Sequence, residues 1–219
     1  MSALRLADFT VRIDRLPIVR EITLSVESGV VCGLIGANGA GKTTLMRGLM
    51  GALDVSGTAG FDGADLTSYP AHKRVALGIG YMPGDRQLVP ELTVEENILL
   101  PAWTISAADA GERLRNIYRL MPELQAAAAR PCPALSGGQQ KLVALGRAMM
   151  AGRRLLLLDE PFEGLAPVLV QRLSEILRNL KSQGLSILVS ESYTTHLEGF
   201  IDIAYRIERG AVRPLESRS

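Results

Sequence analysis

Short apolar runs alternate along the chain with stretches of helical periodicity, and this alternation predicts a sheet with helices packed on it. Continuous apolar runs at Val30–Ile35 and Leu155–Leu158 are typical of strands buried on both faces. Shorter runs at Ile187–Val189 and Ile203–Ile207 predict two further strands, and alternation over residues 22–26 predicts a half-buried one. Strands separated by helices imply βαβ units, so we expect an α/β fold with a mostly parallel, doubly wound sheet.

Apolar residues at helical spacing follow each of the two long runs. They recur from Leu45 to Leu53, directly after the first run. The second such stretch begins with Pro167, which the first turn of a helix tolerates, and continues to Leu180 with Gly184 as the terminating residue. We therefore expect one helix after each of these strands.

The middle of the chain differs, because it contains helix starts but no convincing strand. Thr93 and Glu96 fit a reciprocal capping box at the start of one helix. The alanines of Ala126–Ala129 favour another helix, which the prolines that follow would end. We interpret the chain (1–219) as one domain, with an all-helical subdomain (90–147) inserted into a core formed by residues 1–89 and 148–219.

Composition narrows the class of protein without identifying it. The 219 residues carry 24 Lys and Arg against 23 Asp and Glu, a net charge of +1, which argues against nucleic-acid binding through a basic face. Cys32 and Cys132 lie too far apart for paired metal ligands, and a reducing compartment is expected. No signal peptide is predicted at the start of the chain, and no window approaches the roughly 18 apolar residues that span a bilayer.

One glycine-rich segment matches a phosphate-binding motif. Gly36–Thr43 fits G-x-x-x-x-G-K-[ST] and lies between a predicted strand and a predicted helix, the context that this motif requires. Backbone N–H groups of such a turn surround phosphate oxygens, Lys42 would reach the β- and γ-phosphates, and Thr43 would ligate Mg²⁺. The alternative is a glycine-rich turn without a ligand. The residues assigned to the nucleotide are Gly36, Ala37, Asn38, Gly39, Ala40, Gly41, Lys42, Thr43 and Thr44.

Two carboxylates follow the second long apolar run. Asp159 and Glu160 stand at its C-terminal end, the edge at which open α/β sheets bind ligands. Alone, the pair is also consistent with a strand end that carries solvated charges. Beside a phosphate-binding motif, Asp159 is suited to hold Mg²⁺ and Glu160 to deprotonate an attacking water.

A third motif, Leu135–Gln139, opens another helix. Ser136 and Gln139 fit a capping box, so a well-started helix accounts for these two residues. It does not account for Gly137 and Gly138, since each glycine costs about 1 kcal/mol relative to alanine inside a helix. Close approach of the backbone to a phosphate would explain them, with a purely structural role as the alternative.

Together, the three motifs resemble the ATP-binding cassette (ABC) ATPases over nearly the whole chain, and LSGGQ at 135–139 is highly specific to that family. The resemblance implies a P-loop core, an N-terminal antiparallel β region and an inserted helical subdomain. It also implies a head-to-tail dimer in which the P-loop of one subunit (Gly36–Thr44) and the LSGGQ residues of the other bind the same ATP. The residues assigned to this second contact are Ser136, Gly137, Gly138 and Gln139. The implied activity is Mg²⁺-dependent ATP hydrolysis coupled to transport.

Three stretches are similar to one branch, the ATPase subunits of branched-chain amino-acid, urea and amide importers. They are GLIGANGAGKTTL at 33–45, LTVEEN at 92–97, and GLAP at 164–167. This likeness implies a peripheral subunit at the cytoplasmic face of the inner membrane. Its implied partners are transmembrane permease subunits and a second ATPase subunit, either another copy or a paralogue, but no nucleic acid.

Several positions depart from the general ABC pattern. Ile13 stands where an aromatic residue usually stacks on adenine, Gly84 replaces a glutamine, and Ser192 replaces a histidine that usually contacts the γ-phosphate. His196 lies nearby, but a surface or core role is the simpler reading. Glu160 is retained, so we expect an active ATPase; a catalytically impaired regulatory subunit working with a paralogous ATPase is the alternative. Phe162, Glu163 and Ala166 also depart from the pattern.

Overall fold

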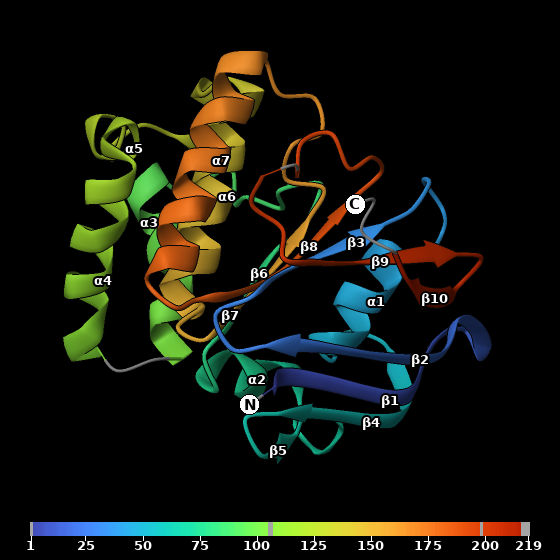
Figure 1. Ribbon diagram of the computed structural model, residues 1–219. Helices are drawn as coiled ribbons and strands as arrows, with labels where there is room; N and C mark the ends of the chain where they lie inside the picture. Colours follow the sequence, from blue (N-terminus) through green and yellow to red (C-terminus); the bar gives the residue numbers. More distant parts are fainter. Residues whose placement is uncertain (1, 105–106, 198, 216–219) are drawn as a thin grey trace.

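The computed structural model describes residues 2–104, 107–197 and 199–215, and its strands form two sheets (Figure 1). One sheet has six strands in the order β10-β9-β3-β8-β7-β6, and the other has four in the order β2-β1-β4-β5. The strands are β1 (Ser2–Ile13), β2 (Leu16–Glu27), β3 (Val31–Ile35), β4 (Asp54–Phe61), β5 (Ala64–Asp65), β6 (Ile79–Met82), β7 (Leu155–Asp159), β8 (Ser186–Glu191), β9 (Ile203–Glu208) and β10 (Ala211–Pro214).

The six-stranded sheet confirms the predicted α/β fold. Strands β9, β3, β8, β7 and β6 pair in parallel, and only the edge strand β10 pairs antiparallel. Strand β7 is buried on both faces, as its continuous apolar run predicts. Leu155 and Leu157 pack on the side of the four-stranded sheet, whereas Leu156 and Leu158 pack on the side of the helices.

The N-terminal strands form the expected antiparallel region. Strand β1 pairs antiparallel with both β2 and β4. Helix α1 lies between the two sheets in Figure 1, and its Leu45, Met46 and Leu49 join the core that both sheets share.

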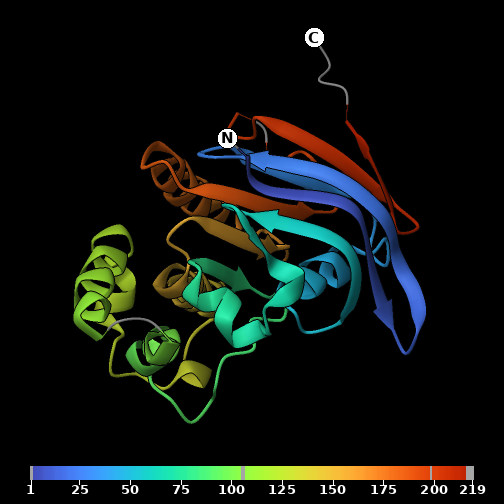
Figure 2. The same ribbon diagram turned by 90° about the horizontal axis from the view of Figure 1, so that it is seen from below.

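The helices that follow residue 90 gather at the opposite end of the molecule from the β1–β2 hairpin, as Figure 2 shows. The α-helices are α1 (Lys42–Leu49), α2 (Ala71–Ala76), α3 (Val94–Leu99), α4 (Ala107–Leu120), α5 (Pro122–Ala126), α6 (Gly137–Ala151) and α7 (Pro167–Ser182). Described residues between 90 and 147 contain no strand, as expected, but α6 continues past 147 and therefore links the proposed subdomain to the core. Within the described part of the chain, no helix combines the length and the apolar character needed to cross a membrane.

Two predicted helices end earlier than their sequence pattern indicates. Helix α1 stops at Leu49 rather than continuing to Leu53, because Gly51 takes a positive φ of 74° just after its end. The helix predicted over Ala126–Ala129 is wrong beyond Ala126. The carbonyl oxygens of Ala128 and Arg130 instead accept hydrogen bonds from N–H groups in the first turn of α3, which have no partner within that helix.

The C-terminal end of α1 depends on a buried arginine. Arg74 of α2 is 3% exposed, and its guanidinium donates to the carbonyl oxygens of Gly48 (2.9 Å), Leu49 (2.7 Å) and Tyr69 (2.8 Å). We expect Arg74→Met to lower the free energy of unfolding by about 2–4 kcal/mol, because it leaves these buried acceptors unpaired. Thermal unfolding measures the loss, and the exposed Arg119→Met is the matched control; equal stability of the two variants would contradict this role.

Candidate functional site

The glycine-rich turn between β3 and α1 has a backbone that other residues would not tolerate. A Cβ at Gly36 would lie 2.3 Å from the carbonyl oxygen of Ile207, and Gly41 has a φ of 112°. The Ala40 side chain packs into the core, and its carbonyl oxygen accepts from the N–H of Gly210. Strand β9 and its turn therefore fix the path of this loop against the sheet.

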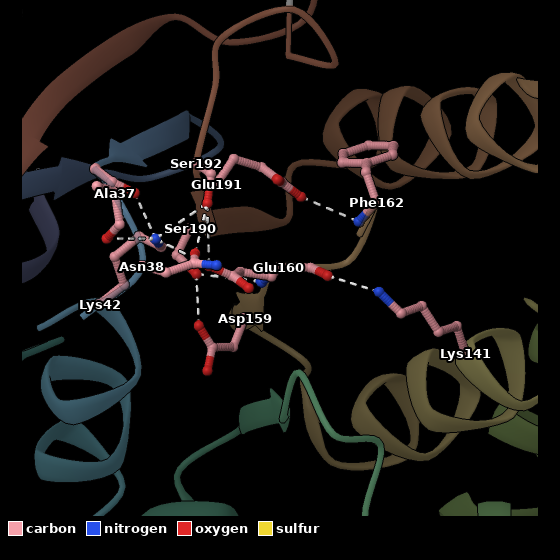
Figure 3. A network of polar contacts seen from close by, with 11 residues as sticks. Ala37, Asn38, Lys42, Lys141, Asp159, Glu160, Phe162, Ser190, Glu191 and Ser192 are labelled. Atoms are coloured by element: carbon pink, nitrogen blue, oxygen red, sulfur yellow. Dashed lines mark hydrogen bonds and ion pairs between the residues drawn. The ribbon is translucent and has the colours of Figure 1, made fainter. Parts of the chain in front are cut away.

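Lys42 is the most connected side chain of the site. It is 4% exposed, and its Nζ donates to the carbonyl oxygens of Gly36 and Ala37, the latter at 3.1 Å. The same Nζ lies 2.9 Å from Glu160 Oε1 and 3.4 Å from Ser192 Oγ (Figure 3). The sequence placed Lys42 and Glu160 in separate motifs, and the fold brings them into an ion pair.

Asp159 lies beside Thr43 and under Ser190. Its side chain is 1% exposed, Ser190 Oγ donates to Oδ1 at 2.6 Å, and the Thr43 side chain is also hydrogen-bonded to this carboxylate. Burial raises the pKa of Asp159, whereas both hydrogen bonds act in the opposite direction. A buried carboxylate beside a hydroxyl offers only oxygen donors, which is the ligand set that Mg²⁺ prefers. Thr43 and Asp159 thus fit the predicted metal role.

Glu160 is held by its backbone as well as by its side chain. Its φ is 47°, in the left-handed region, and its N–H donates to the carbonyl oxygen of Ser190 at 3.1 Å and to Ser190 Oγ at 3.2 Å. Ser192 Oγ lies 3.4 Å from Oε1 of Glu160 and 2.9 Å from Oδ1 of Asn38. Strand β8 therefore holds the backbone of Glu160, and Ser192, just after this strand, contacts its carboxylate, neither of which the separate motifs indicated.

Lys42, Thr43 and Glu160 border an open cavity of about 270 Å³. Its lining residues are Ile18, Asn38, Gly39, Gly41, Lys42, Thr43, Thr44 and Glu160. Ile18 of β2 was not singled out from the sequence. Ile13, at the end of β1, is 38% exposed and does not belong to this lining. Among the described residues that line this cavity, the apolar one is Ile18, an aliphatic residue rather than an aromatic ring.

The LSGGQ residues start α6 and lie away from this cavity. Ser136 Oγ accepts from Gln139 N–H at 3.2 Å while Gln139 Oε1 accepts from Ser136 N–H at 3.0 Å, which confirms the capping box. A Cβ at Gly138 would lie 2.2 Å from Leu169 Cδ1 of α7, so a side chain at this position would require the end of the Leu169 side chain to move. A Cβ at Gly137 would have one described neighbour within 4 Å, Arg86 Nη1 at 3.1 Å. Among the described residues that line the cavity, none comes from Ser136–Gln139.

The structure gives the surroundings of two positions noted in the sequence, Gly84 and His196. Gly84 lies against β7, where a Cβ would be 3.3 Å from the carbonyl oxygen of Asp159. The nearby Gln87 is exposed, and its amide donates to Asp85 at 3.1 Å. His196 is exposed and its ring lies 5.7 Å from that of Phe162, away from the residues that line the cavity. The surface reading of His196 fits this position.

Comparisons with known sequences and solved structures agree on one protein family. Residues 19–163 match the family model described as ABC transporter. The chain is 32% identical over 199 residues to the high-affinity branched-chain amino acid transport ATP-binding protein BraG of Pseudomonas aeruginosa, covering 90% of this chain and 85% of BraG. It is 31% identical over 201 residues to the lipopolysaccharide export system ATP-binding protein LptB of Acidithiobacillus ferridurans, covering 90% and 83%. The structure of MJ1267, an ATP-binding cassette of an ABC transporter in its ADP conformation, has a TM-score of 0.84 at 28% identity and covers 97% of this chain and 90% of its own.

Proposed function

The chain belongs to the ABC transporter family, whose cassettes are ATPases coupled to transport, and we propose that it hydrolyses ATP to drive solute import. The observation that carries this proposal is the meeting of Lys42 and Glu160 at one cavity beside the P-loop, whose Thr43 is hydrogen-bonded to the buried Asp159. Its cargo, in this proposal, is branched-chain amino acids or related small polar solutes. The likeness to BraG supports that choice, whereas the likeness to LptB makes export the competing direction.

The proposed mechanism assigns one task to each group of the site. Backbone N–H groups of the turn bind the phosphates, and Lys42 Nζ is placed to neutralise their charge. Thr43 and Asp159 would hold Mg²⁺, which when bound neutralises charge on the β- and γ-phosphates. Glu160 takes the proton of the attacking water, since its carboxylate faces the same cavity and is 17% exposed.

The active unit in this proposal contains two such subunits. Ser136–Gln139 lie away from the cavity of their own chain, so we propose that they complete the nucleotide site of a second subunit. That subunit is either another copy of this chain or a paralogue. The N–H groups of Gly137 and Gly138 take no part in the capping box, and at the start of α6 they suit contact with a γ-phosphate across such an interface.

The proposed docking surface for a transmembrane partner is the loop over Gly84–Leu92 together with the adjoining helices. Arg147 of α6 donates to the carbonyl oxygens of Arg86 (2.6 Å) and Gln87 (2.7 Å). The buried Asn97 bonds both backbone groups of Val89, at 2.9 and 3.0 Å. A loop held from two helices can transmit movement of a partner to the core. In this proposal the subunit lies peripherally at the cytoplasmic face of the membrane.

Co-purification tests this proposal. The tagged chain, expressed in its own host, should carry a transmembrane subunit from detergent-solubilised membranes, and the double variant Asp85→Ala/Gln87→Ala should lose it because both side chains are exposed on the loop. The matched control is Asp54→Ala/Gln183→Ala, which removes the same groups from distant exposed positions. Equal recovery of the partner with both double variants would contradict the assigned docking surface.

Turnover and transport measurements separate the competing readings. Leucine uptake into vesicles that contain the complex supports import, and extrusion of a lipid-linked saccharide supports export. ATP turnover by the isolated chain would reject the regulatory-subunit alternative, which Ile13, Gly84 and Ser192 favour. Turnover only after addition of a paralogue would support that alternative.

A further inference from the structure

We infer that Lys141 and Glu191 are positioning residues for the general base, holding the turn that follows Glu160 from its two sides. This inference rests on the proposed ATPase function. Neither residue lines the nucleotide cavity, and neither belongs to the motifs that identify the chain. Figure 3 shows Lys141 and Lys42 on opposite sides of Glu160, so residues of both α6 and the P-loop contact the proposed base.

Lys141 connects α6 to the backbone of the base. It is 7% exposed, and its Nζ donates to the carbonyl oxygen of Glu160 at 2.8 Å and to that of Glu163 at 2.5 Å. Removing an ammonium from water is costly unless it is hydrogen-bonded or paired, and burial lowers the pKa of Lys141. A buried cation that spans both ends of a short turn therefore fixes the shape of that turn.

Glu191 holds the same turn from β8. Its carboxylate is 4% exposed, and Oε1 accepts from the N–H of Phe162 at 3.0 Å. Glu191 also pairs with Ile35 at the end of β3, where its carbonyl oxygen accepts from the N–H of Gly36. One residue thus touches both the first residue of the P-loop and the turn after the base.

The two contacts act on a backbone that needs external support. The left-handed φ of Glu160, 47°, is unfavourable for a residue with a side chain and persists only when its surroundings hold it. Ser190 accepts from the Glu160 N–H, Lys141 donates to the Glu160 carbonyl oxygen, and Glu191 accepts from the N–H of Phe162, two residues further on. A misplacement of about 1 Å in a reacting group can cost on the order of 100-fold in rate.

Charge at Glu191 gives this arrangement a measurable signature. Burial, and next the charge of Glu160, raise the pKa of Glu191 to about 7, whereas the N–H of Phe162 and the charge of Lys141 act in the opposite direction. Glu191 therefore takes up a proton as the pH falls through neutrality, where an exposed glutamate stays ionised. The amide resonance of Phe162, bonded to this carboxylate, should shift over that range.

Full-length variants test the inference alongside wild type and Glu160→Gln, which establish whether the chain is an ATPase at all. We expect Lys141→Met and Glu191→Leu to lower kcat about 10-fold or more with little change in the affinity for ATP. Lys141→Arg, which keeps the charge, and Glu191→Gln, which keeps an acceptor for the Phe162 N–H, should each recover most of that loss. Thermal unfolding of every variant identifies any that fails to fold.

The outcomes are distinct. If wild type hydrolyses ATP and Glu160→Gln does not, yet Lys141→Met and Glu191→Leu match wild-type kcat, the positioning role is overturned and the ATPase function stands. A fall in ATP affinity equal to the fall in kcat would also overturn it. In NMR, the Phe162 amide should titrate near neutral pH in the wild type but not in Glu191→Gln; identical titration in both would overturn the assigned contact.

Discussion

Glu160→Gln is expected to lower kcat for ATP hydrolysis by about 10²–10⁴-fold, because a positioned general base contributes roughly this factor. The amide has nearly the shape of the carboxylate and keeps an oxygen toward Lys42, which lies 2.9 Å from Oε1 in the wild type. ATP should therefore still bind, with an affinity close to that of the wild type. Steady-state phosphate release and equilibrium titration with a fluorescent nucleotide measure the two quantities separately.

Glu175→Gln provides the matched control for this experiment. It makes the same change of charge on the exposed face of α7, away from the cavity lining. Its kcat should equal that of wild type. Unchanged steady-state hydrolysis in Glu160→Gln would remove Glu160 from the role of base and would leave the proposed function without its catalytic group.

Lys42→Ala is expected to abolish measurable ATP binding, with Kd raised by about 100-fold or more. Lys42 is the cation that the turn surrounds, and hydrogen bonds to charged groups contribute about 1.5–3 kcal/mol each. The substitution also leaves Glu160 without its ion-pair partner, so that carboxylate would face the phosphates with its charge uncompensated. Both changes act in the same direction on nucleotide affinity.

Calorimetric titration with ATP measures this loss, and Lys73→Ala is its control. Lys73 lies on the exposed surface of α2 and contributes to no part of the nucleotide cavity. Binding by Lys42→Ala with an affinity near that of Lys73→Ala would exclude the P-loop as the phosphate site. Unfolding curves for both proteins show whether a loss of binding reflects a loss of fold.

The strands and the motifs at their ends were predictable because each is a local pattern. The run at Leu155–Leu158 is apolar throughout since the strand is buried on both faces, and a strand of this kind places Asp159 at a ligand-binding edge. The contacts of Ser190 with Asp159 and Glu160 were not predictable. They depend on the parallel register of β7 and β8, which pairs Asp159 with Ser190, and no local pattern records that register.

Gly138 is a second position whose surroundings could not be predicted from the sequence. The sequence indicates that Gly138 is costly in a helix, and it suggests a phosphate as the reason. The structure adds a contact that the sequence does not indicate, since a side chain at this position would displace the end of Leu169 of α7. Helix–helix distances of this kind arise only once residues far apart in sequence have packed.

The pairing of Lys42 with Glu160 has a consequence for the order of events in a catalytic cycle. While the ammonium is bound to the carboxylate, each offsets the charge of the other. In the proposed site, a phosphate that reaches Lys42 would compete for the same cation, so binding of nucleotide would loosen the ion pair with Glu160. Arrival of substrate and release of the proposed base would then be one event rather than two.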